Sequence, residues 1–176
     1  MPYQNFLVVD VCGEGTQDAI PCALGIGTFS TIGMTEFKYF EFSHCAGEVK
    51  SLAGNVPMFD NVEQELFLQL QGNVVCFRSG EAQLSLEALY KQYKFALPIF
   101  QRVNLQQLMQ NLYPEKAEEM ETTDCSVAYQ GKKVTRLILE ERIGKMGQFV
   151  IDTLDTEKPL ESLILLQSNR TSDMVC

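Results

Sequence analysis

The chain has 176 residues and a formal net charge of −9, and 45% of its residues are hydrophobic and 21% charged. This composition is typical of a soluble globular protein, and no apolar run is long enough to cross a membrane. The acidic residues are spread along the chain, which disfavours avid binding to nucleic acid, and the nearest approach to a basic cluster is Lys132, Lys133 and Arg136. The N-terminus has no signal-peptide pattern, so we expect an intracellular, cytoplasmic protein without a membrane partner.

The first 42 residues predict three strands. A short apolar run covers 6–11, small and β-branched residues cover 20–31, and polar and apolar residues alternate over 34–42. The links between them are short and rich in turn residues, which favours an antiparallel meander. The alternation breaks step at Phe40 to Phe42, which predicts a bulge in the third strand.

The rest of the chain alternates helix and strand. Apolar periodicity predicts helices over 59–70, 80–93 and 104–112, with Asn104 capping the third, and strands over 73–77 and 100–103. Residues 115–136 are polar and predict a loop with a short helix, and a last helix carries Ile143 to Leu154. This order predicts one α/β domain over 1–157, whose fourth strand is parallel to the first, and a partly disordered tail over 158–176.

Asp10 ends the first strand, in the stretch FLVVDVCGEG, where a glycine-rich turn follows. With this element order, the chain resembles the DEDD-type 3′–5′ exonucleases of the DnaQ and RNase T group, over about residues 5–155. The resemblance implies a ribonuclease H-like fold: a mixed sheet of three antiparallel strands and then parallel strands, flanked by helices. It also implies two divalent cations, Mg²⁺ or Mn²⁺, held by about four carboxylates.

The first two motifs of that family are only partly present. Asp10 matches the first family aspartate, but the glutamate expected two residues later is Cys12, a ligand too soft for magnesium. Glu14 lies two positions further along. The second aspartate position falls on Glu81, which could bind a metal, or on Ala82, which could not.

The third motif matches least. On the last helix, the family histidine corresponds to Arg142 and the following aspartate to Gly147. The only histidine, His44, follows the third strand, so it cannot be the motif histidine. Recruiting Asp152 or Asp155 would move the carboxylate one to two turns along the helix.

Four interpretations are compatible with these residues. The first is a catalytically inactive exonuclease-like protein that binds a protein partner as an adaptor or regulatory module, without a cofactor. The second is an active Mg²⁺- or Mn²⁺-dependent 3′–5′ exonuclease on DNA or RNA with displaced ligands at Asp10, Glu14, Glu81 and Asp152. Another is an unrelated α/β domain with a small-molecule site at the carboxyl end of its sheet.

The remaining interpretation is a zinc site built from cysteines. An antiparallel meander with a parallel fourth strand would bring several cysteines and the single histidine to one end of the sheet. These residues are Cys12, Cys22, His44, Cys45 and Cys76. Their spacing does not match a known zinc motif, and a buried cysteine is commonly a small apolar core residue. The oligomeric state is left open by the sequence.

Overall fold

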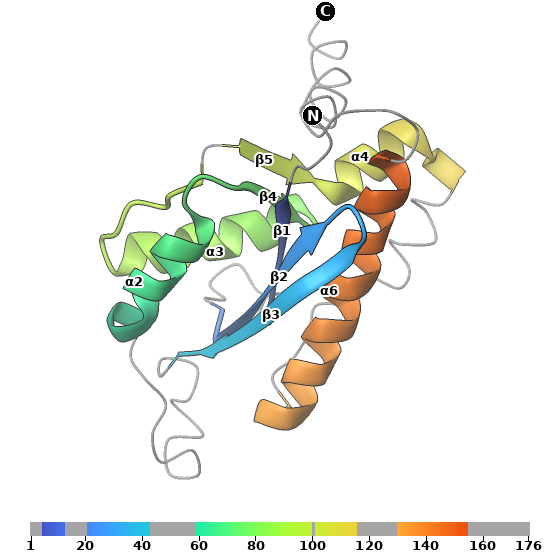
Figure 1. Cartoon of the computed structure of the whole chain (residues 1–176). Helices are drawn as coiled ribbons and strands as arrows, with labels where there is room; N and C mark the ends of the chain where they lie inside the picture. The colour runs from blue at the N-terminus through green and yellow to red at the C-terminus, as the bar shows by residue number, and fades with distance from the viewer. Residues whose placement is uncertain (1–4, 13–20, 43–58, 100, 116–129, 155–176) are drawn as a thin grey trace, which may run out of the picture.

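Five strands form one mixed sheet in the computed structural model, which describes residues 5–12, 21–42, 59–99, 101–115 and 130–154 (Figure 1). The strands are β1 (Phe6–Cys12), β2 (Ala23–Ser30), β3 (Gly33–Glu41), β4 (Val74–Phe77) and β5 (Gln101–Asn104). They are arranged in the order β3-β2-β1-β4-β5. β1 and β2 pair antiparallel, as do β2 and β3, whereas β4 lies parallel to both β1 and β5.

This arrangement confirms the predicted α/β class with a mixed sheet flanked by helices. β1 lies in the middle of the sheet, and all seven of its residues are buried. Burial on both faces explains why its sequence is almost continuously apolar rather than alternating. Asp10 is therefore the exceptional residue of the strand, since a carboxylate is costly to bury without partners.

Helices cover both faces of the sheet. They are α2 (Phe59–Leu70), α3 (Gly80–Gln92), α4 (Leu105–Leu112) and α6 (Lys132–Leu154). Side chains of α2 and α3 share a core cluster with Leu7, Val9 and Val11 of β1, whereas those of α4 and α6 share a second cluster with Phe6 and Val8. Alternate residues of β1 thus face opposite layers, and Figure 1 shows α2 and α3 on one side and α6 on the other.

Side-chain caps fix the starts of two helices. The Ser79 hydroxyl accepts a hydrogen bond from the Ala82 amide at the start of α3. The side chain of Asn104 accepts from the Gln107 amide at 3.0 Å, which confirms the predicted cap of α4.

Two sequence predictions were wrong in detail. α6 begins at Lys132, so residues 132–136 are helical rather than loop. The irregularity in β3 lies near its start, where Thr28 pairs with Glu36 but Phe29 pairs with Met34, leaving Thr35 as an extra residue. Phe40 and Phe42 both lie in the core cluster beneath α2 and α3, so the alternation does not break there.

The predicted tail over 158–176 lies outside the described residues. No helix in the part of the chain that the structure describes is long and apolar enough to cross a membrane.

Candidate functional site

Asp10 lies on β1 with its side chain toward α6, and none of its surface is exposed. Its neighbour across the antiparallel pair is Gly25, which has no side chain to fill the space above the carboxylate. One carboxylate oxygen, Oδ1, accepts a hydrogen bond from the Val11 amide at 3.0 Å. The two remaining polar partners are arginines from different elements.

Arg78 approaches Asp10 from the neighbouring parallel strand. Val9 is level with Phe77 in the β1–β4 register, so the next residues, Asp10 and Arg78, are also brought level. Nε of Arg78 lies 3.4 Å from Oδ1 of Asp10, and only 6% of the Arg78 side chain is exposed. The Arg78 carbonyl accepts from the Gln106 amide of α4, which anchors the backbone directly after β4.

Arg142 reaches the same carboxylate from α6. Its Nε lies 2.9 Å from Oδ2 of Asp10, and 21% of its side chain is exposed. α6 can come this close because β2 carries Gly25 and Gly27 beneath Ile143, and a Cβ at Gly25 would lie 3.0 Å from the Ile143 side chain. The small residues of β2 therefore determine how near Arg142 comes to the sheet.

Burial and the arginines act in opposite directions on the carboxyl group. Removal from water raises the pKa of Asp10, and this is the largest effect. The charges of Arg142 and Arg78, with the Val11 amide, lower it in part. The arginines and the amide are thus the groups that favour the ionised carboxylate inside the protein.

The described surroundings of Asp10 do not suit a pair of divalent cations. Arginine stays charged at any physiological pH, so a metal ion would have to approach between two guanidinium groups that repel it. The nearby Cys12 offers a soft ligand, which magnesium does not prefer. Among the described residues, no group of three or more His, Cys, Asp and Glu side chains is arranged to hold a metal.

The other predicted carboxylates do not join Asp10 in the described part of the chain. Glu81 lies in the first turn of α3 and is exposed. Asp152 is exposed on α6 and accepts a hydrogen bond from Gln148 at 2.8 Å. It lies ten residues after Arg142, which is about 15 Å along the helix axis. Glu14 and Asp155 lie outside the described residues.

The cysteines of the predicted zinc set are divided between clusters. Cys12 and Cys22 are close, with their sulfur atoms 3.7 Å apart, and they pack with Leu139 of α6. Cys76 is level with Val8 of β1 and lies in the core cluster under α4 and α6. Burial raises the pKa of Cys12 to about 12 and also raises the pKa of Cys76. His44 and Cys45 lie outside the described residues.

Gly147, which the resemblance aligns with a catalytic aspartate, is a packing position. A Cβ at this glycine would overlap the ring of Phe29 in β2. Phe29 in turn stacks on Phe6 of β1, with ring centroids 5.3 Å apart. No side chain larger than hydrogen fits there without moving this aromatic pair.

Arg78 was not predicted from the sequence as a site residue, and no role was predicted for the charge of Arg142. One signal was available for Arg78: it directly follows a buried strand predicted to be parallel to β1, as Asp10 ends β1 itself. Equal positions on neighbouring parallel strands place side chains together at one edge of the sheet. The opposite charges at those positions predict an ion pair.

The sequence matches no protein-family model, and no curated protein is significantly similar to it.

Proposed function

We propose that this chain is a catalytically inactive, exonuclease-like protein that works by binding another protein. The observation that carries the proposal is the double ion pair of Asp10 with Arg78 and Arg142. An exonuclease of the two-metal type needs this carboxylate for a cation. Here each oxygen of the carboxylate lies within ion-pair distance of an arginine, at 3.4 Å for Arg78 and 2.9 Å for Arg142.

The architecture supports the same interpretation. Three antiparallel strands followed by two parallel ones, with helices on both faces, agree with the ribonuclease H-like fold that the sequence resemblance implies. On the alignment with that family, Arg142 replaces the histidine and Gly147 replaces the aspartate. The ring of Phe29 occupies the space that a side chain at Gly147 would need. The scaffold is retained while the groups that activate water are replaced.

A protein is the favoured class of partner. The net charge of −9 repels a phosphate backbone. The clustered basic residues Lys132, Lys133 and Arg136 lie within two turns at the start of α6, which is a short patch for binding nucleic acid. Large apolar side chains are available on the helices of the opposite layer, where Leu68 of α2 is 69% and Leu84 of α3 is 64% exposed. Apolar anchors of this kind contribute much of the energy of protein interfaces.

The nuclease half of the proposal is tested with purified protein, single-stranded DNA and RNA, and Mn²⁺. We expect no degradation above that of an Asp10→Asn preparation purified in the same way. Degradation by the wild-type protein that disappears in Asp10→Asn would contradict the proposal, since it would show that this carboxylate supports catalysis.

The binding half is tested by affinity capture with the intact chain as bait. Leu68→Glu and Leu84→Glu each place a charge on the α2–α3 layer, and Leu137→Glu is the matched control on α6, where Leu137 is 65% exposed. We expect the wild-type bait to capture one protein partner in stoichiometric amount. The Leu137→Glu bait should still capture it, whereas the Leu68→Glu and Leu84→Glu baits should not. Capture of nucleic acid in place of protein would reverse the assignment of partner class.

The zinc interpretation remains a separate proposal. Cys22 is disulfide-bonded in the structure, and Cys76 lies in another cluster. The proposal therefore requires Cys22 to be reduced, so that it can join Cys12 in a set completed by His44 or Cys45. Elemental analysis of the purified protein decides it: one zinc per chain supports the site, and less than a tenth of that excludes it.

A further inference from the structure

β3 is an edge strand of the sheet in the described part of the chain. It stands at one end of the strand order, next to β2, and Figure 1 shows it along the front of the sheet. Its residues from Met34 to Glu36 are exposed, and most of the others are half-buried. An edge strand presents backbone donors and acceptors to which another strand can pair.

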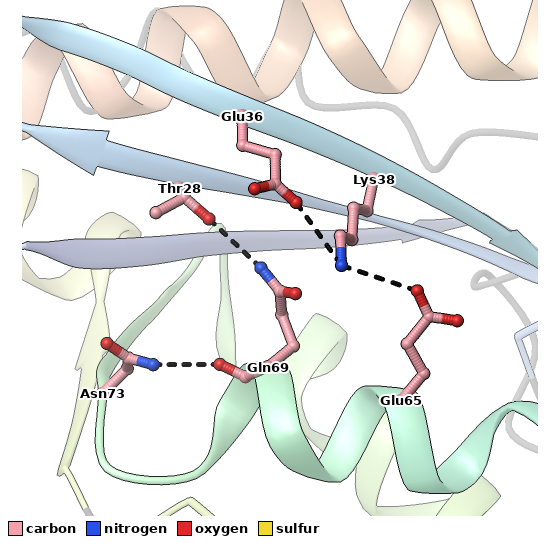
Figure 2. A network of polar contacts seen from close by, with 6 residues as sticks. All are labelled: Thr28, Glu36, Lys38, Glu65, Gln69 and Asn73. Atoms are coloured by element: carbon pink, nitrogen blue, oxygen red, sulfur yellow. Dashed lines mark hydrogen bonds and ion pairs between the residues drawn. The ribbon is translucent and has the colours of Figure 1, made fainter.

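The middle of β3 carries two opposite charges on one face. Glu36 and Lys38 both point toward α2, where the Lys38 ammonium lies 3.4 Å from Glu36 and 3.5 Å from Glu65 (Figure 2). About half of the Glu36 side chain (51%) and a third of the Lys38 side chain (35%) remain exposed. Both charges can therefore interact with a further strand laid along the edge.

Polar side chains connect α2 to the outer strands on the face of the sheet that carries Glu36 and Lys38. Gln69 of α2 donates to the Thr28 hydroxyl of β2 at 3.2 Å, and Lys38 reaches Glu65 across the same space (Figure 2). These long polar side chains join α2 to the outer strands in addition to the apolar cluster that Leu66 and Leu70 share with Ile26 and Phe40. Glu36 and Lys38 are held at the surface instead of being drawn into the core.

We propose that the β3 edge is a self-association surface, on which a second copy of this chain pairs its own β3 antiparallel around a two-fold axis at Phe37. In that register, Glu36 of each copy lies opposite Lys38 of the other. The four charges alternate in sign around the axis, and residues directly opposite in an antiparallel pair have Cβ atoms about 5 Å apart. The pairing is self-complementary, as a two-fold interface requires.

The neighbouring registers are disfavoured by the same charges. Moving the axis by one residue toward the N-terminus places Glu36 opposite Glu36, and moving it the other way places Lys38 opposite Lys38. Like charges directly opposite each other destabilise a strand pair. The extra residue at Thr35 ends the regular stretch of β3, which limits the pairing to a short central segment. These features select one closed dimer against open-ended edge pairing.

This inference goes beyond the proposed function and does not depend on it, because the edge would pair in an active enzyme as well. It is tested by light scattering coupled to size-exclusion chromatography over a range of protein concentrations. We expect the wild-type chain to be a dimer. Glu36→Lys and Lys38→Glu should each weaken the dimer by roughly tenfold or more, since both opposed pairs become repulsive.

Mixing the two variants is the decisive step. The Glu36→Lys variant carries two positive charges on this face of β3 and the Lys38→Glu variant two negative ones, so the mixture should form a heterodimer although neither variant pairs with itself. The double reversal, Glu36→Lys with Lys38→Glu, restores alternation and should dimerise like the wild type. Because both side chains are at least partly exposed, and because the mixture rescues association, misfolding cannot produce this pattern.

Matched charge reversals outside β3 are the controls. Glu65→Lys removes a neighbour of Lys38 on α2, and Lys145→Glu alters an exposed position on α6 where 78% of the side chain is accessible. Both should leave the dimer intact. A wild-type chain that stays monomeric at every concentration would overturn the proposal, as would single variants that still dimerise or a mixture that does not associate.

Discussion

Asp10 is a carboxylate in the middle strand of the sheet, where all seven residues are buried. On the sequence, a carboxylate at the end of a buried strand suggests a metal ligand. In the folded chain it is fully buried, and an arginine side chain contacts each of its oxygens. Its arginine partners come from the residue directly after β4 and from α6, so the carboxylate joins two parts of the chain that are far apart in sequence.

Replacing Arg142 by Met should reveal this structural role. The change leaves Asp10 buried with Arg78 as its remaining cation, and breaking a buried ion pair from one side costs about 3 kcal/mol. Urea unfolding followed by circular dichroism measures the loss of stability. Lys145→Met, which removes an exposed pair with Glu141, is the control and should cost less than about 1 kcal/mol. Equal effects of the two variants would show that the Asp10 ion pair is not structural.

The buried thiols make a second prediction at this scale. Because burial raises the pKa of Cys12 to about 12, hardly any thiolate forms at pH 8, and Cys76 behaves likewise. Alkylation by iodoacetamide at pH 8, followed peptide by peptide by mass spectrometry, should be roughly a thousandfold slower for Cys12 in the native protein than in urea. The native rate should rise about tenfold for each pH unit above pH 8, because the thiolate fraction does so at any pH well below the pKa. Equal labelling of Cys12 in the native and unfolded protein at pH 8 would contradict this environment.

At the scale of elements, the close approach of α6 to β2 organises the site. Gly25 and Gly27 on the strand and Gly147 on the helix remove side chains from the contact, and Ile143 and Phe29 fill the space. This approach brings Arg142 within reach of Asp10. The glycines therefore shape the site although none of them contributes a functional group.

Two glycines of α6 provide a matched test of this packing. Gly147→Ala should destabilise the protein by about 1–3 kcal/mol, because the added methyl group overlaps Phe29. Gly144→Ala has open space around it and should stabilise the protein by up to about 1 kcal/mol through helix propensity. Thermal unfolding of both variants measures the difference. A stabilising Gly147→Ala would mean that α6 lies further from β2 than described.

Most elements were predictable because their apolar periodicity is local. In β1, β4 and the helices α2 to α4, the buried residues form an apolar run or an apolar helical face that is visible in the sequence. The Asn104 cap is a local hydrogen bond. The first turn of α6 was missed because Lys132, Lys133 and Val134 are exposed and show no buried face. The position of the bulge was missed because it depends on how Thr28 and Phe29 pair with β3, which is a contact between strands.

At the scale of the whole molecule, the mixed sheet sets which parts of the chain meet around Asp10. The sequence predicted the strand directions and the position of Asp10, since both follow from connection lengths and from one buried strand. The ion pair with Arg78 had a signal in the sequence, but the approach of Arg142 had none, because it depends on how closely α6 packs against the sheet. The charge of the site, and with it the proposed function, is a property of the tertiary structure.

If the arginines take the electrostatic place of divalent cations at Asp10, the folded chain has no Mn²⁺ site at this carboxylate. The wild-type chain and the Asp10→Asn variant are titrated with MnCl₂ by isothermal calorimetry. Asp152→Asn is the control, because it removes an exposed carboxylate on α6. Circular dichroism first shows that each variant is folded. We expect no saturable binding that depends on Asp10. Saturable binding that persists in Asp152→Asn and disappears in Asp10→Asn would contradict it.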